Sequence, residues 1–393
     1  MERNSFIPCG WADEIDARIA RIASALTKAG VEAMLIADNT NLYYTSGRVF
    51  AGYTYITAGG ECRYFVRRPQ GYDHPHLTYI HKPEQIFDLL SAKPASMALL
   101  HDSLTVADHA RLCKAFPGVD TVDGSAIMRQ LRAIKSPFEQ ELLKADGVHH
   151  VEAYRRIPKV YRKGMSDIEL QIEIEHLLRS EGCLGLFRIH GQSMELFMAN
   201  VLCGPNADNA SPYDFAMGGA GLDPSLPVGA DGTIIDPGMT VMVDACGNFN
   251  GYMTDMTRCY YVGTLNDAAR RAHEVSVSIH HRLAADSHAG TPAKQLYDTA
   301  AAMADEAGLA DYFMGHNQKA GFVGHGLGIE INEAPVLAPR SRDVLAEGHV
   351  IAIEPKFVIP GVGAVGIENT YIVRADHLEC ITPAPESLAE LYW

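Results

Sequence analysis

The residues best suited to chemistry in this chain are four carboxylates and one histidine in its C-terminal half. In chain order they are Asp244, Asp255, His325, Glu354 and Glu368. Carboxylate oxygens and an imidazole nitrogen are common ligands of divalent cations. Taken singly, none is a strong signal, because an isolated acid near a turn is more often a capping or turn residue and a lone histidine is more often structural. The case for a metal site therefore depends on all five meeting in the fold.

The first two acids flank a predicted β-hairpin. Asp244 ends an apolar run and Asp255 follows a turn that contains Gly251, so the hairpin would bring the two carboxylates close together. Neighbouring carboxylates repel each other, and one of them takes up a proton unless a cation lies between them. Taken alone, such a pair is more often two turn or capping residues, so a shared cation depends on the remaining three residues.

The remaining three residues come from segments further along the chain. His325 lies between two glycines, which permit close backbone approach to a ligand. Glu354 and Glu368 each interrupt an apolar, strand-like run, and a buried carboxylate needs a counter-charge or strong hydrogen bonds. Four carboxylates carry a charge of −4, which two divalent cations would balance. Such a pair would acidify a bridging water into a hydroxide nucleophile; we expect Mn²⁺, with Co²⁺, Zn²⁺ and Fe²⁺ open.

The elements that must position these residues fall into two predicted domains. In the first third, helical spacing of apolar residues from Ile15 to Leu26 is followed by strand-like runs at 31–37, 53–57 and 63–66, which indicates a small α/β domain. A boundary is predicted between residues 125 and 136. We therefore expect domains at 1–130 and 136–393.

The second predicted domain mixes helices with an antiparallel-looking sheet, an α+β arrangement. Pro137 is placed to begin a long helix, and Ser166 with Glu169 forms a capping box for the next. Further helices are predicted at 267–286 and 291–307, and strands at 240–245, 257–262, 350–353 and 366–373.

Composition excludes several classes of function. The formal net charge of −15 disfavours binding to nucleic acid phosphates. The sequence contains no run of eighteen apolar residues, so we expect no membrane span. The N-terminus lacks a signal-peptide pattern. The eight cysteines form no CxxC pair, so we expect them to be free thiols in a reducing compartment. We expect a cytoplasmic protein.

The order Asp–Asp–His–Glu–Glu resembles the M24 metallopeptidase family, which includes aminopeptidase P, prolidase and methionine aminopeptidase, with creatinase as a metal-free relative. Residues 136–393 resemble its pita-bread catalytic domain, and residues 1–130 resemble the creatinase/prolidase-type N-terminal domain. The segments 41–47 and 131–137 fit the two-domain subgroup.

The resemblance implies a dinuclear metal-dependent hydrolase. By this resemblance Asp244 would bind one metal, Asp255 and Glu368 would bridge both, and His325 with Glu354 would complete the second. Glu354 would also be the catalytic proton shuttle. The implied substrate is a short peptide or small amide, and the implied assembly is a homodimer.

Four positions depart from the family pattern. Where related peptidases carry histidines or an arginine around the metal centre, this chain has Ser211, Gly321, Asn332 and Gly366. Serine, glycine and asparagine cannot carry a proton near neutral pH. Other polar residues in the region are interpreted as structural: His190, His316 and Tyr213.

Three functions follow from this pattern. The leading hypothesis is an Xaa-Pro-type peptidase of the aminopeptidase P or prolidase kind. The alternative is a non-peptidase on the same scaffold, a small-molecule amidohydrolase or a lyase acting on an osmolyte-like substrate, which the missing histidines favour. A non-catalytic binding module is the third, and it is disfavoured because such domains usually lose metal ligands.

Overall fold

The computed structural model describes residues 5–191 and 194–392. The chain divides into two compact units, residues 1–132 and 133–393, and each is described by itself. Within the described residues, no helix is long and apolar enough to cross a membrane.

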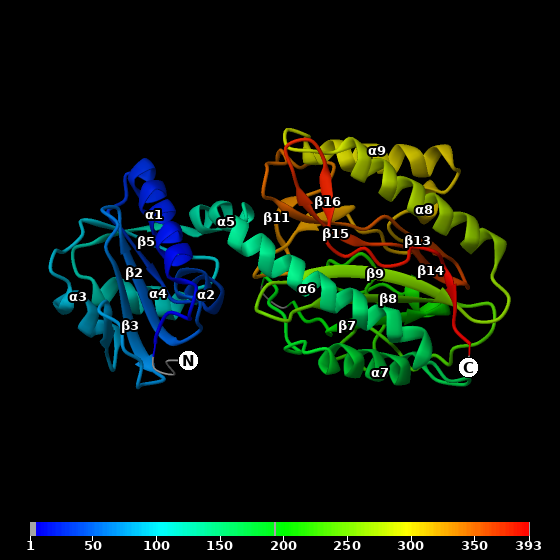
Figure 1. Ribbon diagram of the computed structural model, residues 1–393, viewed down its shortest axis with the longest axis horizontal. Helices are drawn as coiled ribbons and strands as arrows, with labels where there is room; N and C mark the ends of the chain where they lie inside the picture. Colours follow the sequence, from blue (N-terminus) through cyan, green and yellow to red (C-terminus); the bar gives the residue numbers. More distant parts are fainter. Residues whose placement is uncertain (1–4, 192–193, 393) are drawn as a thin grey trace. The chain divides into compact units, whose positions relative to one another are not determined.

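The first unit is a six-stranded mixed sheet with helices around it, in the strand order β4-β3-β2-β1-β5-β6 (Figure 1). Its elements are α1 (Ala12–Ala29), β1 (Ala33–Ile36), α2 (Asn39–Ser46), β2 (Ala51–Thr57), β3 (Cys62–Arg68), β4 (Leu77–Tyr79), η1 (Pro83–Gln85), α3 (Ile86–Leu89), β5 (Ser96–Leu99), α4 (Val106–Ala115), β6 (Asp120–Asp123) and α5 (Ser125–Ala133), which ends at the boundary.

The local sequence explains these elements. The apolar residues of α1 from Ile15 to Leu26 are buried, as their helical spacing predicts, and Gly30 ends the helix in a left-handed conformation. Strands β2 and β3 form the predicted antiparallel hairpin around Gly59 and Gly60. All four residues of β1 are buried, so side chains cover both faces of this strand.

The second unit carries the candidate chemistry. Its helices are α6 (Pro137–Arg156), η2 (Ile157–Lys159), α7 (Asp167–Ser180), η3 (Gly204–Asp208), α8 (Asp267–Asp286), α9 (Ala293–Glu306) and η4 (Ala310–Tyr312). Its strands are β7 (Ala199–Cys203), β8 (Thr240–Gly247), β9 (Thr254–Tyr261), β10 (Gly324–Gly326), β11 (Glu333–Val336), β12 (Val350–Ile353), β13 (Lys356–Ile359), β14 (Gly363–Gly366), β15 (Asn369–Val373), β16 (Leu378–Cys380) and β17 (Ala389–Glu390).

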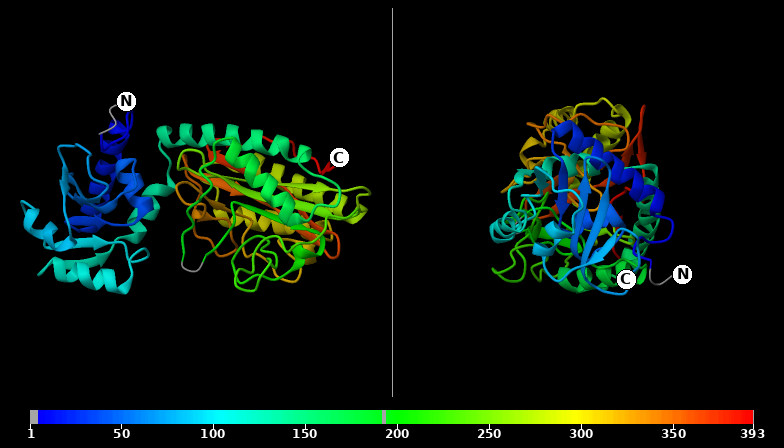
Figure 2. Two further views of the ribbon diagram at one scale, coloured as in Figure 1. Left: turned by 90° about the horizontal axis from the view of Figure 1, so that it is seen from below. Right: turned by 90° about the vertical axis from the view of Figure 1, so that its left-hand side faces the viewer.

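Two sheets and a hairpin form the middle of this unit. The sheet orders are β17-β9-β8-β7 and β11-β10-β12-β15-β16, with β13 and β14 paired as the hairpin. Helix α7 packs on β7, and α8 packs on β13 and β14, so helices cover the strands on opposite sides (Figure 1). Helix α6, whose N-terminus is capped by Ser136, runs along the length of the unit (Figure 2). Two of the hydrophobic clusters described in this unit include buried residues of these helices.

The predicted strand at 366–373 is wrong in one respect, because it is two strands. β14 ends at Gly366, whose φ of 145° is a left-handed conformation that favours glycine. The chain then passes from the β13–β14 hairpin to β15, in the other sheet. Glu368 lies in this passage, between the end of β14 and the start of β15. Its carboxylate bonds to the hydroxyl of Thr257 on β9.

Candidate metal centre

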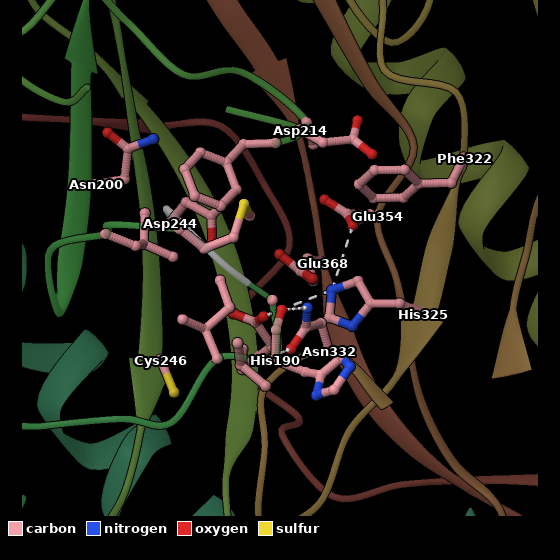
Figure 3. A pocket seen from close by; sticks show the side chains of 18 of the residues that line it. His190, Asn200, Asp214, Asp244, Cys246, Phe322, His325, Asn332, Glu354 and Glu368 are labelled. Atoms are coloured by element: carbon pink, nitrogen blue, oxygen red, sulfur yellow. Dashed lines mark hydrogen bonds and ion pairs between the residues drawn. The ribbon is translucent and has the colours of Figure 1, made fainter. Parts of the chain in front are cut away.

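The five predicted residues meet at one cavity. Its volume is about 440 Å³, and the side chains of Asp244, Asp255, His325, Glu354 and Glu368 all line it. Figure 3 shows four of them, Asp244, His325, Glu354 and Glu368, around the cavity. The structure thus brings together residues that lie more than a hundred positions apart in sequence.

The hairpin of β8 and β9 positions the first two acids. Asp244 pairs with Thr257 and Cys246 pairs with Asp255, so both aspartates project from the same face of the sheet as diagonal neighbours. Tyr154 of α6 donates its hydroxyl toward the carbonyls of Val243 and Met256, one from each strand. These bonds hold the backbone next to both aspartates.

The other three residues come from neighbouring strands of the second sheet. His325 lies on β10 opposite Ala352 of β12, and Glu354 directly follows β12. Glu368 directly precedes β15, and its backbone N–H donates to the carbonyl of Thr257 on β9 over 3.1 Å. The end of this sheet therefore meets the β8–β9 hairpin at the cavity.

One group of ligand atoms surrounds the imidazole of His325. Nδ1 of His325 lies 3.1 Å from the carbonyl oxygen of Gly326, so an Nδ1–H can donate to it and leave the lone pair of Nε2 free. Nε2 lies 3.6 Å from Oε1 of Glu354 and 3.8 Å from Oδ2 of Asp255. Ligand atoms of Asp255, His325 and Glu368 all lie within 4.8 Å of one another.

Glu368 supplies an oxygen without a protein partner. Its Oε2 accepts from Thr257 Oγ1 at 2.7 Å, whereas its Oε1 is buried and has no hydrogen-bond partner. A buried carboxylate oxygen left unpaired is costly, and a bound cation removes that cost. The group around His325 therefore fits a divalent cation.

A buried lysine, which the sequence analysis missed, occupies the other part of the centre. Nζ of Lys356 lies 2.7 Å from Oδ2 of Asp244, 2.7 Å from Oε2 of Glu354 and 3.3 Å from Oε2 of Glu368. Its side chain is 0% exposed. The charge count made from sequence, four carboxylates against two divalent cations, omits this ammonium group.

The electrostatics of the cluster demand positive charge. Burial, together with the charges of Glu368 and Asp244, raises the pKa of Asp255 well above its usual range. Burial and the charge of Glu354 raise the pKa of Glu368 to about 8. Burial alone would lower the pKa of Lys356, but the surrounding carboxylates outweigh it and raise the pKa. Lys356 is therefore an ammonium ion near neutral pH, and the carboxylates around His325 still lack a full counter-charge.

The local sequence does contain a signal for Lys356. It follows Glu354 and Pro355 and begins the strand-like run Lys356–Ile359, all of whose residues are buried. A lysine at the start of a fully buried strand needs a carboxylate partner, because the cost of burying an unpaired ammonium is high. The search for metal ligands considered only acids and histidines, and so passed over it.

The four positions that depart from the family pattern do not form a proton-carrying shell. Ser211 donates its hydroxyl to the carbonyl of Pro227 at 2.9 Å and is not part of the cavity wall, and Gly321 is exposed. Asn332 lines the cavity, but its amide exchanges two hydrogen bonds with the backbone of His190. Gly366 pairs with Lys356 across the β13–β14 hairpin.

The residues interpreted as structural have different surroundings. His190 lines the cavity, and its Nδ1 lies 3.9 Å from Oε1 of Glu330. His316 pairs with Asp208 at 2.9 Å and stacks on Tyr312, and it is not part of the described cavity wall. Tyr213 donates its hydroxyl to Glu195 at 3.0 Å.

Above the acids, the cavity wall is mostly apolar. It includes three phenylalanines and three methionines, among them Phe197, Phe215 and Phe322. Asp214 adds another carboxylate, and the described lining residues include no arginine or lysine. The cavity thus suits a small, partly apolar substrate that carries no strong negative charge.

Comparisons with known proteins agree with this geometry. Residues 141–375 match the sequence model of metallopeptidase family M24, and residues 18–134 match the creatinase/prolidase N-terminal domain. The Xaa-Pro dipeptidase of Pyrococcus horikoshii is 25% identical over 96% of this chain and 99% of its own length. The Xaa-Pro dipeptidase of Lactobacillus helveticus is 27% identical over 74% of this chain and 71% of its own length.

Solved structures give the same fold. The Xaa-Pro dipeptidase from Bacillus anthracis superposes with a TM-score of 0.80 at 24% identity, over 96% of this chain and 100% of that chain. The X-Pro aminopeptidase from Thermotoga maritima gives 0.78 at 20% identity, over 95% and 99%. The predicted fold class is confirmed, with a creatinase-type N-terminal domain followed by a mixed α/β pita-bread catalytic domain.

Proposed function

Because the chain belongs to metallopeptidase family M24, we propose that it hydrolyses the amide bond of a short Xaa-Pro-type peptide in the cavity described above. Membership of this family makes the protein a metal-dependent hydrolase and implies a dinuclear metal centre. A divalent cation bound there supplies a Lewis acid, which lowers the pKa of a water molecule and polarises the scissile carbonyl.

The proposed roles of the chain's own residues follow from their positions. The family pattern proposes Asp244, Asp255, His325, Glu354 and Glu368 as the candidate metal ligands. Glu354 is also the proposed proton shuttle, which accepts a proton from the attacking water and delivers it to the leaving nitrogen. Burial raises the pKa of its carboxyl, and the ammonium of Lys356 opposes this shift. A carboxyl with a raised pKa is better suited to exchange protons near neutral pH.

One observation carries this proposal most directly. A buried carboxylate oxygen of Glu368 without a partner lies in a group with Asp255 and the imidazole of His325, at the floor of a cavity. Buried acids are normally paired, and a cluster that retains excess negative charge is typical of a cation site. The names of the relatives support Xaa-Pro peptides as the substrate class.

The proposal is tested with chelator-treated protein that is reloaded separately with Mn²⁺, Co²⁺, Zn²⁺ and Fe²⁺. We expect release of alanine from Ala-Pro and Ala-Pro-Phe that depends on metal and is fastest with Mn²⁺, because the ligands are mainly oxygens. Ala-Ala-Phe serves as the control for the requirement for proline. Absence of hydrolysis with every metal would exclude an Xaa-Pro peptidase.

A second candidate function rests on the substituted positions. Asn332 has its amide bonded to the backbone of His190, and Ser211 lies away from the cavity, so neither can replace a proton-carrying histidine. This favours a small-molecule amidohydrolase or a lyase acting on an osmolyte-like substrate. A panel of small amides and osmolytes, screened with the same metal-loaded protein, separates the two candidates. Turnover of a panel member without peptide cleavage would select the second.

We also propose a homodimer, as the two-domain subgroup of the family suggests. The described cavity is lined by residues of the second unit alone. Light scattering of the purified protein at several concentrations checks this proposal, and a monomer at all of them would contradict it.

A further inference from the structure

We propose that this centre binds a single divalent cation per chain and that the ammonium group of Lys356 takes the place of a second one. The inference rests on the proposed function in one respect, namely that the centre binds metal at all. The ligands of the single cation are then Asp255, His325, Glu354 and Glu368.

The three N–H bonds of the Lys356 ammonium group are matched by three carboxylate oxygens. An ammonium group has three N–H bonds and accepts none. Three carboxylates, those of Asp244, Glu354 and Glu368, each place one oxygen within 3.3 Å of Nζ. A metal ion binding these oxygens at about 2.0–2.2 Å would lie against the positive charge of Nζ, without water to screen the repulsion.

The backbone of Lys356 is fixed in place. Its carbonyl accepts from the N–H of Met314 at 2.9 Å, and it pairs with Gly366 in the β13–β14 hairpin. A Cβ atom on Gly366 would lie 2.9 Å from the Cα of Lys356, so the two strands pack closely here. The side chain is also fully buried, so the ammonium group makes its contacts with the three carboxylates away from solvent.

Glu354, Glu368 and Asp255 each keep an oxygen that Lys356 does not bind and that is available on the side of His325. Oε2 of Glu354 bonds to Lys356, while Oε1 lies 3.6 Å from Nε2 of His325. Likewise Oε2 of Glu368 is used, while Oε1 has no partner. Asp255 makes no bond to Lys356, and its Oδ2 lies 3.8 Å from the same imidazole nitrogen. Asp255 and Glu368 thus offer oxygens in one group with His325, and Glu354 offers an oxygen to the same imidazole nitrogen.

The charges of the centre agree with this division. When all four carboxylates are ionised, they and the one ammonium group carry a net charge of −3. One divalent cation leaves −1, which an incoming substrate amine or polarised carbonyl can tolerate. Two divalent cations would leave +1 in a buried centre, with the ammonium unpaired, and an uncompensated buried charge is strongly destabilising.

The test is the metal content of the full-length protein. The protein is saturated with Mn²⁺, freed of excess by gel filtration, and analysed by mass spectrometry of the metal against protein concentration. We expect one Mn²⁺ per chain and the electron paramagnetic resonance spectrum of an isolated ion. Two ions per chain with a spin-coupled spectrum would overturn the inference while leaving the proposed function intact. No bound metal would overturn both.

Matched variants identify Lys356 as the cause. Lys356→Ala removes the ammonium and opens space among the three carboxylates, so we expect its metal content to rise from one to two per chain. The control is Lys135→Ala, because Lys135 is also buried and pairs with a single carboxylate, that of Glu333, at 2.9 Å. We expect this control to retain one metal per chain.

A variant that fails to fold must be distinguished from one that fails to bind. Circular dichroism and gel filtration establish folding, and Lys356→Met, which keeps the volume without the charge, provides a second variant. A folded Lys356→Ala or Lys356→Met protein that still binds only one cation, even at saturating Mn²⁺, would contradict the proposed role of the ammonium.

Discussion

Nζ of Lys356 lies 2.7 Å from Oδ2 of Asp244, so this aspartate already has a cationic partner supplied by the chain itself. Asp244 is also the most exposed acid of the centre, at 22% of its side chain, whereas Glu368 is 1% exposed. The five metal-ligand candidates are therefore not equivalent. Asp255 and Glu368 lie in one group with His325, Glu354 lies between this imidazole and Lys356, and Asp244 contacts Lys356.

The first prediction concerns the two aspartates of the β8–β9 hairpin. Asp255→Asn should abolish metal binding, because Asp255 is directed at the imidazole of His325. Asp244→Asn should change the metal content little, because it removes only a partner of Lys356. Isothermal titration of each variant with Mn²⁺ measures both effects. Equal loss of binding in the two variants would contradict the unequal roles.

The second prediction concerns Glu354 as proton shuttle. Glu354→Gln keeps an oxygen ligand but cannot accept a proton, so kcat should fall by about 10²–10⁴-fold while the melting temperature changes little. Steady-state kinetics on the best Xaa-Pro peptide measure this. Glu347→Gln, at an exposed glutamate, is the matched control and should retain full activity. A Glu354→Gln enzyme with unchanged kcat would remove Glu354 from the mechanism.

The fold could be predicted from the sequence where periodic patterns are long. The helix Asp267–Asp286 and the strand Val350–Ile353 occur at the predicted bounds, and Ser166 caps α7 as its motif indicates. The passage from Gly366 to Asn369 could not be predicted, because an apolar run carries no information about a switch between sheets. The break between the two strands occurs at Gly366, whose positive φ is seen only in the structure.

The candidate site was predictable in its ligand types but not in its charge. Acids that interrupt apolar runs identified Glu354 and Glu368, since burial of a carboxylate needs an explanation. The partner of Asp244 could not be found in this way, because Lys356 approaches it from a strand 112 residues away. Only the packing of β14, the hairpin partner of β13, against β8 and β9 places an ammonium there.

A third prediction concerns the pH dependence of stability through Asp146. This residue lies on α6, where its Oδ2 accepts from the N–H of Phe249 at 3.0 Å and its Oδ1 is buried without a partner. Burial raises the pKa of its carboxyl to about 7, despite hydrogen bonds that lower it. The folded state therefore holds a proton that the unfolded state releases near pH 4, and the stability of the wild type falls as pH rises from about 4 to 7.

Asp146→Asn removes this loss, because the amide stays neutral. Relative to the wild type, the variant should gain about 4 kcal/mol in free energy of unfolding above pH 7, and the gain should shrink as pH falls toward 4. Urea denaturation of both proteins across this range, at constant metal concentration, measures the difference. A difference that does not vary with pH would show that the carboxyl is not protonated in the folded state.

A fourth prediction concerns the charge of the substrate. Among the described residues that line the cavity, there is no arginine or lysine to pair with a C-terminal carboxylate, and Asp214 adds a further negative charge. An amidated substrate such as alanyl-prolinamide should therefore be cleaved with a kcat/KM at least about tenfold higher than Ala-Pro, equivalent to about 1.4 kcal/mol. A preference for the free dipeptide would mean that a cation from outside the described lining binds its carboxylate.

Anomalous diffraction from crystals of the Mn²⁺-loaded protein measures most directly how many metal ions this centre binds and where they lie. We expect one strong peak within coordination distance of Nε2 of His325 and oxygens of Asp255, Glu354 and Glu368, with Nζ of Lys356 still bonded to Asp244. Two peaks of comparable height, with the lysine displaced, would contradict the single-cation centre. Absence of any peak would contradict the assignment of these side chains as metal ligands.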